Sequence, residues 1–222
     1  FYLPTFGYFA FTMFFLAGIG VLRVLWLPLL DLSPNVLRLG EIVYLPCMAF
    51  GFLLIPASCV IMVIGLTVFT LSVFTWLYSK FKGLEIADFW LYKYSRHPQY
   101  LGFLVWSYGL MLLASYVNAE RAGHVPAPSF PWLISALAIV GVALHEEQTM
   151  IRKHGDKYKK YMEKTPFVIP LPKKLSTIIT APARMAIKKN WPENTKQTLS
   201  VLLIYFCILV LSSLPLQYFM KL

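Results

Sequence analysis

The chain has 222 residues, of which 58% are hydrophobic and only 14% are charged, and its formal net charge is +10 at neutral pH. Soluble domains have roughly 45–50% apolar and about 25% charged residues, so this composition excludes a disordered chain, a collagen-like chain and the usual soluble globular classes. In so apolar a chain, the positive charge marks the surface that meets anionic lipid and the cytoplasm, not a nucleic-acid site.

Five apolar stretches approach or exceed the roughly 20 residues that a helix needs to cross a bilayer. They are residues 1–22, 42–78, 99–117, 130–145 and 198–220. The sequence therefore predicts an all-α fold, a polytopic transmembrane helical bundle of about five to six membrane helices. Pro46 and Pro56 interrupt the run 42–78. That run is either one long kinked helix or a short segment, 42–55, followed by a full span, 57–78.

Lysine and arginine are concentrated in two segments of the chain. Residues 149–197 hold 12 of the 20 basic residues, and residues 79–98 hold four more. By the positive-inside rule both segments are cytoplasmic, and the nearly neutral link 118–129 lies on the opposite side. The spans 99–117 and 130–145 then form an antiparallel hairpin whose polar ends meet at the cytoplasmic face.

The basic segment that follows the hairpin is rich in proline, which predicts broken structure. A short interfacial helix is expected near 175–189, where apolar residues alternate with Lys and Arg. We therefore expect four regions: N-terminal transmembrane helices at 1–80, a core of hairpin and polar motifs at 81–172, a basic interfacial linker at 173–197 and an extra C-terminal transmembrane helix at 198–222.

The first polar motif lies at 94–102, before the hairpin. Pro98 suits the first turn of a helix, where its missing N–H costs nothing, so the free N–H groups of that turn lie beside Arg96. A helix N-terminus with an adjacent arginine binds carboxylate or phosphate groups. His97 fits a helix cap or a ligand contact, and Gly102 lets a backbone or a ligand approach closely. A snorkelling arginine with a helix cap is an equally good interpretation.

The second polar motif is the pair Glu146 and Glu147 at the end of an apolar helix. Carboxylates at the bilayer boundary are costly and are candidates for function. Neighbouring residues on a helix point about 100° apart, so the two cannot form a carboxylate dyad. One can face the site while the other faces water or pairs with a base. The expected target is a cationic or hydroxyl-bearing ligand group, and the alternative is a solvated helix end.

A third pattern continues the helix beyond the paired acids. Five residues recur on one face of an amphipathic helix: Met150, His154, Tyr158, Tyr161 and Thr165. Gly155 weakens this helix, so a break is expected there. Packing against the bundle is the expected role for any single one of these side chains.

Several catalytic patterns are missing from the sequence. The four histidines show no metal-ligand spacing, and the three cysteines show no paired spacing. The chain has no nucleophile elbow, Walker loop or dinucleotide-binding glycine motif. We therefore expect no metal site and no soluble cofactor domain.

The polar motifs resemble those of a known enzyme family. The segment 94–102 resembles the Arg-His-Pro-x-Tyr-x-Gly motif of the isoprenylcysteine carboxyl methyltransferases and the related phospholipid methyltransferases, which are integral membrane proteins. Glu146-Glu147, residues 154–161 and residues 166–170 resemble the second block of the same family, in the same order and spacing. The resemblance covers residues 92–170, about a third of the chain.

The resemblance implies a polytopic helical enzyme that binds S-adenosylmethionine in a cytoplasmic pocket formed by the C-terminal half, while a lipophilic acceptor enters from the bilayer. The residues implied as catalytic are Arg96, His97 and Glu147. The residues implied as cofactor-binding are Tyr94, Arg96, His97, Tyr100, Gly102, Glu146, Glu147, Tyr158 and Tyr161.

The chemistry of this cofactor is consistent with those residue types. Its carboxylate suits Arg96 and a helix N-terminus, its ammonium and ribose hydroxyls suit a glutamate, and its sulfonium suits aromatic faces. Methyl transfer to a carboxylate needs alignment and desolvation but no base. An amine acceptor must first lose a proton, which His97 or a glutamate can take.

The expected partners are membrane lipid and an acceptor that is either a lipophilic small molecule or a lipidated molecule. A partner protein in a membrane complex is a further alternative, and no nucleic acid is expected. The expected location is a multi-pass position in the endoplasmic reticulum or a prokaryotic plasma membrane, with the active site facing the cytoplasm.

Departures from the family pattern leave two alternatives. Residues 89–94 replace the usual Gly-Pro-Tyr turn, His154 replaces the usual Phe, and the span 198–220 is added. These three departures fit a non-catalytic scaffold subunit, which is the first alternative.

The second alternative is an NADPH-dependent sterol-type reductase, because these enzymes share a similar C-terminal architecture. They typically carry Trp in the position of Tyr158 and lack the paired glutamates, so the sequence favours methyl transfer over reduction.

Overall fold

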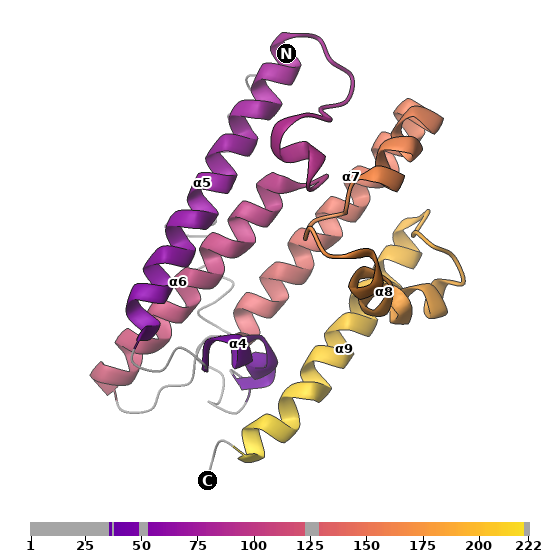
Figure 1. The fold of residues 1–222 in the computed structure, drawn as a ribbon. Helices are drawn as coiled ribbons and strands as arrows, with labels where there is room; N and C mark the ends of the chain where they lie inside the picture. The colour runs from indigo at the N-terminus through magenta and orange to yellow at the C-terminus, as the bar shows by residue number, and fades with distance from the viewer. Residues whose placement is uncertain (1–35, 37, 49–52, 123–128, 220–222) are drawn as a thin grey trace.

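The computed structural model describes residues 36, 38–48, 53–122 and 129–219, and the regular structure within them is entirely helical (Figure 1). The elements are η1 (Arg38–Tyr44), α4 (Leu45–Met48), α5 (Leu54–Phe81), η3 (Trp90–Lys93), α6 (Pro98–Ala122), α7 (Ser129–Lys164), α8 (Lys173–Ile187) and α9 (Thr195–Phe219). The predicted all-α fold is confirmed. The predicted span 1–22 lies outside the described residues.

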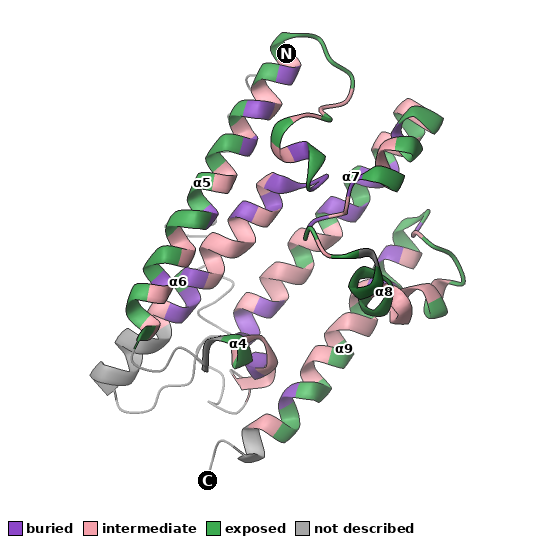
Figure 2. Cartoon of the chain, viewed as in Figure 1, coloured by how far each residue is buried: buried purple, intermediate pink, exposed green. Residues whose placement is uncertain are grey.

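Three of the described helices are long and apolar enough to cross a membrane: Leu54–Phe81, Ser129–Lys164 and Thr195–Leu216. In the first and third, only 11% of the most apolar stretch is buried inside the protein. Figure 2 shows exposed residues recurring along the whole of α5. A soluble protein does not leave so much apolar surface in water, so the chain is an integral membrane protein.

The charge-free run 42–78 contains one full-length helix preceded by short elements. η1 and the four-residue α4 end at Met48, and α5 begins at Leu54. Pro56 falls in the first turn of α5, where proline is tolerated. Of the two arrangements that the sequence left open, the structure has the short segment followed by a full span.

A seam of small residues holds α5 against α6, which lies beside it in Figure 1. Every seventh residue of α5 is small and buried: Ser58, Gly65, Ser72 and Ser79. A Cβ on Gly65 would lie 2.3 Å from the backbone nitrogen of Trp106, and a Cβ on Gly102 would lie 2.4 Å from that of Phe69. Both distances are shorter than atomic contact, so only glycine allows the two backbones to approach this closely, as in other membrane helix pairs.

α7 bends sharply, and the chain then returns toward the start of α6. Gly155 has φ 53° and ψ −129°, outside the helical range, while the residues on both sides of it are helical. The predicted continuation of the helix and its break at Gly155 are confirmed.

α8 occupies the position of the predicted interfacial helix. Gln148 donates to the Thr198 hydroxyl at 2.9 Å and to the Pro192 carbonyl at 3.2 Å, which fixes the start of α9 against α7.

We expect Gly102→Ala to lower the free energy of unfolding by about 1–3 kcal/mol, the usual cost of overpacking, because the new methyl group meets the backbone of α5. Gly141→Ala is the matched control, since the nearest atom to its Cβ is the movable Leu202 Cδ1 at 2.9 Å. Thermal unfolding of the purified chain in detergent measures both variants. Equal melting temperatures for Gly102→Ala and the native chain would contradict the tight seam.

Candidate functional site

The two polar motifs are joined first through their backbones. The amide of Arg96 donates to the Pro166 carbonyl at 2.9 Å, and the amide of His97 donates to the Phe167 carbonyl at 3.2 Å. The His97 carbonyl accepts the first intrahelical hydrogen bond of α6, and Pro98 takes the first helical position as predicted. The segment that follows α7 therefore lies directly against the start of α6, and the predicted meeting of the hairpin's polar ends is confirmed.

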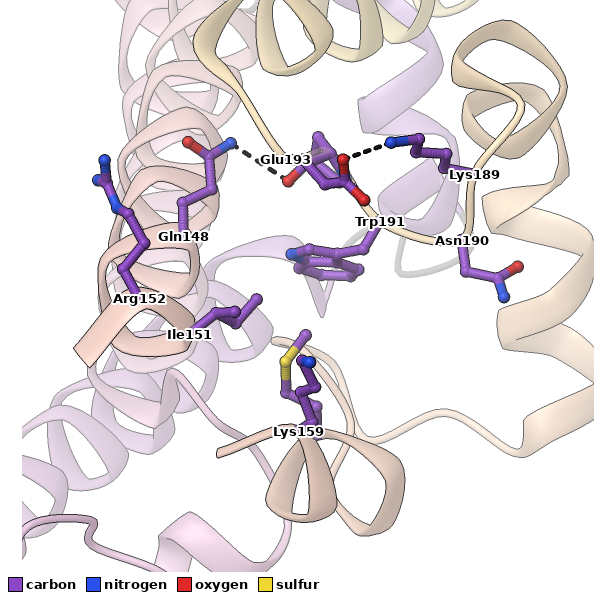
Figure 3. Close-up of a pocket in the computed structure, with 10 residues that line it drawn as sticks. Gln148, Ile151, Arg152, Lys159, Lys189, Asn190, Trp191 and Glu193 are labelled. Carbon is purple, nitrogen blue, oxygen red and sulfur yellow. Dashed lines mark hydrogen bonds and ion pairs between the residues drawn. The ribbon is translucent and has the colours of Figure 1, made fainter. Parts of the chain in front are cut away.

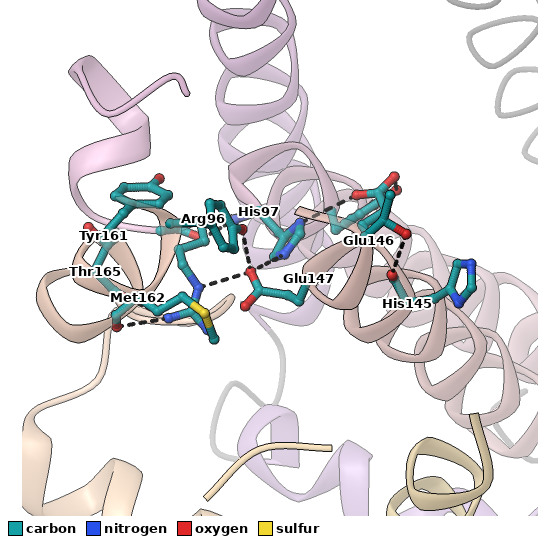
Figure 4. Close-up of polar contacts among 12 residues, drawn as sticks. Arg96, His97, His145, Glu146, Glu147, Tyr161, Met162 and Thr165 are labelled. Carbon is teal, nitrogen blue, oxygen red and sulfur yellow. Dashed lines mark hydrogen bonds and ion pairs between the residues drawn. The ribbon is translucent and has the colours of Figure 1, made fainter. Parts of the chain in front are cut away.

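Glu147 of α7 lies at the centre of the polar contacts (Figure 4). Its side chain is 0% exposed. Its Oε1 atom lies 3.0 Å from Arg96 Nε, 2.9 Å from His97 Nε2 and 2.8 Å from the Tyr158 hydroxyl. A carboxylate accepts hydrogen bonds and donates none, so all three partners donate to this one oxygen. They offset the large cost of burying a negative charge.

The bend at Gly155 makes this arrangement possible. Glu147 and Tyr158 are 11 residues apart, which in a straight helix corresponds to about 16 Å of rise. Because α7 turns at Gly155, the Tyr158 hydroxyl returns to within 2.8 Å of the carboxylate. The positive φ of Gly155 is a conformation that favours glycine over other residues.

Arg96 connects several segments around this carboxylate. Its Nη1 atom donates to the carbonyls of Met162 and Thr165 at 3.0 and 2.9 Å, which lie at the end of α7, where backbone acceptors lack helical partners. The ring centroids of Phe167 and Trp191 lie 5.6 and 5.1 Å from its guanidinium carbon, within the range of a cation–π contact. Arg96 is only 7% exposed, so its guanidinium serves mainly to hold the protein together.

Glu146 faces a different direction from Glu147, as the helical spacing predicts. Its side chain is 49% exposed. Its Oε1 atom accepts a hydrogen bond from the Tyr100 hydroxyl at 2.7 Å, and its Oε2 atom lies 3.6 Å from His97 Nδ1. The rings of His97 and Tyr100 stack with their centroids 5.6 Å apart. One acid of the pair is therefore buried against bases, while the other is accessible from outside.

The remaining residues implied as cofactor-binding fall at different places. Tyr161 packs edge-on against Tyr158, with ring centroids 5.7 Å apart, and its hydroxyl donates to the Tyr92 carbonyl at 2.7 Å. Burial raises the pKa of the Tyr92 phenol, so this group stays protonated at neutral pH. Tyr94 is 66% exposed and takes no part in the hydrogen bonds described above. Gly102 lies in the α5–α6 seam, where its missing side chain allows the close approach of the α5 backbone.

Trp191 is a contact residue that the sequence analysis missed. It comes from the predicted linker 173–197 and packs edge-on against Phe167, with ring centroids 5.0 Å apart, as well as against Arg96. A single tryptophan in a basic, proline-containing segment forms no recognisable motif. Only the return of the chain after α8 brings it to the site.

One oxygen at the centre of the site is unsatisfied. Glu147 Oε2 is buried and has no hydrogen-bond partner among the described residues. A buried acceptor without a partner costs about 1–3 kcal/mol or more, so it is a natural place for a ligand N–H or O–H group. Within the described part of the chain, no group of three or more His, Cys, Asp or Glu side chains could hold a metal ion.

Comparison with protein families gives one match. A family model described as "Protein of unknown function (DUF1295)" matches residues 54–165, half of the chain. The match begins at the first residue of α5 and ends directly after α7, so it contains the network from Arg96 to Tyr161. It leaves out α8, Trp191 and α9.

Two curated proteins are similar to part of the chain. Protein-S-isoprenylcysteine O-methyltransferase of Schizosaccharomyces pombe is 34% identical over 82 residues, which are 36% of this chain and 31% of that protein. Methanethiol S-methyltransferase 1 of Bradyrhizobium diazoefficiens is 37% identical over 82 residues, which are 36% of this chain and 24% of that protein. The chain therefore spans less than a third of the length of these relatives. No solved structure is significantly similar to it.

We expect Glu147→Gln to lower the free energy of unfolding by about 3 kcal/mol, because it leaves the buried Arg96 without its counter-charge. Glu146→Gln is the matched control at the neighbouring position. Its half-exposed amide still accepts the Tyr100 hydroxyl, so the change should stay within about 0.5 kcal/mol. Unfolding in detergent, followed by circular dichroism, measures both. Equal losses in the two variants would show that the network does not depend on the buried charge.

Proposed function

The chain belongs to the family described as "Protein of unknown function (DUF1295)", and from that premise we propose that it is a membrane-embedded, S-adenosylmethionine-dependent methyltransferase. Its acceptor is a lipophilic molecule of the prenylcysteine carboxylate or phospholipid headgroup type. The observation that carries the proposal is the meeting of Arg96, His97 and both glutamates at one end of the bundle, from the two motifs that resemble the methyltransferases.

The names of the two curated relatives support transfer of a methyl group more strongly than they support any one acceptor. Both are methyltransferases, but one name specifies an isoprenylcysteine oxygen and the other the sulfur of methanethiol. Methyl transfer is what the two names share. The similarity of this chain to both proteins is therefore better explained by a common methyl donor than by a common acceptor.

The side chains on the open face of the network fit S-adenosylmethionine, which when bound supplies a methyl group on a sulfonium. This cofactor is a net cation, because its sulfonium and ammonium outweigh one carboxylate. Glu146 is half exposed and offers the negative charge that an ammonium or ribose hydroxyl needs. Tyr100 lies beside it, buried, and its hydroxyl holds the Glu146 carboxylate in place. Glu147 lies behind this face, fully buried, and holds the His97 ring from inside the protein.

The geometry favours different roles for the three residues proposed as catalytic. Arg96 and Glu147 are buried and hold each other, so we assign them to positioning the site. His97 is different, because its two ring nitrogens face two carboxylates: Nε2 lies 2.9 Å from Glu147 Oε1, and Nδ1 lies 3.6 Å from the half-exposed Glu146 Oε2. We assign the proton of an amine acceptor to His97 or Glu146, whereas a carboxylate acceptor needs no base.

The distribution of charge favours a cytoplasmic site. The end of α5, the start of α6 and the end of α7 lie toward the same end of the molecule (Figure 1), and the segments beyond them hold most of the Lys and Arg. Basic segments face the cytoplasm in membrane proteins. The proposed membrane is the endoplasmic reticulum or a prokaryotic plasma membrane.

We expect S-adenosylhomocysteine to bind the purified chain in detergent with micromolar affinity, and Glu146→Gln to weaken this binding about ten-fold, the effect of losing one charge-assisted hydrogen bond. Calorimetric titration measures both. Glu163→Gln, an exposed acid elsewhere on α7, is the matched control and should bind as the native chain does.

The same titration includes NADPH. Binding of NADPH in place of S-adenosylhomocysteine would contradict the proposal and favour a reductase. Binding of neither by a folded, monodisperse sample would contradict it in favour of a non-catalytic scaffold subunit.

A further inference from the structure

We propose that a second site, on the opposite face of α7 from Glu146, binds the phosphate group of an anionic membrane lipid. A cavity of about 520 Å³ lies between α7 and the connection from α8 to α9 (Figure 3). This volume is within the roughly 300–1,000 Å³ of typical ligand pockets. The cavity is lined by Gln148, Ile151, Arg152, Lys159, Met162, Lys189, Asn190, Trp191, Pro192 and Glu193.

The cavity is separate from the open face of the network. At about 100° per residue, Gln148 and Arg152 lie about 200° and 240° around α7 from Glu146. Glu147 and its partners stand between the two faces, and Trp191 covers Arg96 on the cavity side. A ligand in the cavity therefore does not contact Glu146.

The lining of the cavity is positively charged. Arg152, Lys159 and Lys189 contribute three cations against the single carboxylate of Glu193, to which Lys189 is paired. The remaining two have weak partners. Lys159 forms an exposed ion pair with Asp156 at 3.1 Å, of a kind that adds little stability. Arg152 donates to the Thr149 hydroxyl at 3.3 Å. Lys159 and Arg152 therefore have no strong partner, and Figure 3 shows the Arg152 guanidinium at the rim, on the side of α7 away from Trp191.

The indole nitrogen of Trp191 adds an unused donor to these cations. Trp191 Nε1 is buried and has no hydrogen-bond partner among the described residues. Figure 3 shows the indole in the middle of the lining residues with its nitrogen turned toward α7. An indole N–H only donates, so the complement of this site is a group rich in acceptor oxygens. A phosphate supplies such oxygens together with negative charge.

The cavity lies at the level where lipid headgroups are found. α9 is one of the candidate membrane spans, and it begins at Thr195, two residues after Glu193 of the cavity. α8 precedes the cavity and exposes a row of large apolar side chains: Leu175, Ile178, Ile179 and Met185. Such a helix, with basic residues around it, is typical of the membrane interface. A lipid phosphate can therefore reach the cavity while its acyl chains stay in the bilayer.

The charge of the cavity also argues against the methyl donor as its occupant. S-adenosylmethionine is a net cation and is disfavoured by a lining with two more positive than negative side chains. The acidic face at Glu146 suits that cation better. The lipid site stands independently of the proposed methyltransferase activity, since it rests on the cavity, its charges and its place beside α9.

The test uses native mass spectrometry of the full chain released from detergent, with three probes: phosphatidylglycerol, glycerol phosphate without acyl chains, and inorganic phosphate. We expect retained phosphatidylglycerol and at least about 100-fold weaker binding of both soluble probes, because the acyl chains add apolar contact with the bilayer-facing helices. Arg152→Gln with Lys159→Gln should weaken phosphatidylglycerol binding about ten-fold or more.

Lys160→Gln with Lys164→Gln is the matched control, because it removes two exposed charges from the same helix without touching the cavity lining. It should leave lipid binding within about two-fold of the native chain.

A further variant, Trp191→Phe, keeps a ring over Arg96 but removes the indole N–H. It should weaken phosphatidylglycerol binding about two- to ten-fold. Melting temperatures of all variants check that they remain folded.

Three results would overturn the proposal. Equal weakening by both double variants would mean that lipid is attracted by net charge alone. Equal affinity for glycerol phosphate and phosphatidylglycerol would make the ligand a soluble phosphate. Unchanged lipid binding in the Arg152→Gln, Lys159→Gln variant would mean that the lipid binds outside the cavity.

Discussion

A buried carboxylate costs several kcal/mol unless donors surround it, and the described core of this chain is arranged to supply them to Glu147. Arg96 and His97 come from the start of α6, and Tyr158 comes from beyond the bend of α7. The bend at Gly155, the backbone pairing of the segment after α7 and the packing of Trp191 against Arg96 bring these donors to the carboxylate or enclose them. One charge thus fixes the relative positions of segments far apart in the sequence.

This arrangement places Glu146 and Arg152 on different faces of α7. Glu146 lies on one side, half exposed beside Tyr100. Arg152 and other bases lie on the other, around a cavity closed by Trp191. A cationic methyl donor suits the acidic face, and a lipid phosphate suits the basic one. The proposed methyl donor and the proposed lipid phosphate carry opposite net charges, so separate sites keep each ligand away from the site of the other.

The sequence was sufficient for features that depend on local pattern and charge. The positive-inside distribution predicted that the hairpin brings Arg96 to the glutamate pair, and helical spacing predicted that Glu146 and Glu147 diverge. The sequence was insufficient for features that depend on how segments far apart in the chain pack together. The seven-residue spacing of small residues in α5 was present but hidden among apolar neighbours. The close approach expected at Gly102 was left open between a backbone and a ligand, because the partner helix was unknown. Trp191 needed the path of the chain after α8.

The most direct test of the central role of the buried pair is a double-mutant cycle with Arg96→Met and Glu147→Met, measuring the free energy of unfolding and S-adenosylhomocysteine binding. Each single variant leaves one buried charge unpaired, whereas the double variant leaves none. We expect a coupling energy of about 3 kcal/mol and loss of binding in all three variants. Additive effects within about 0.5 kcal/mol, or a double variant that binds as tightly as the native chain, would contradict this central role.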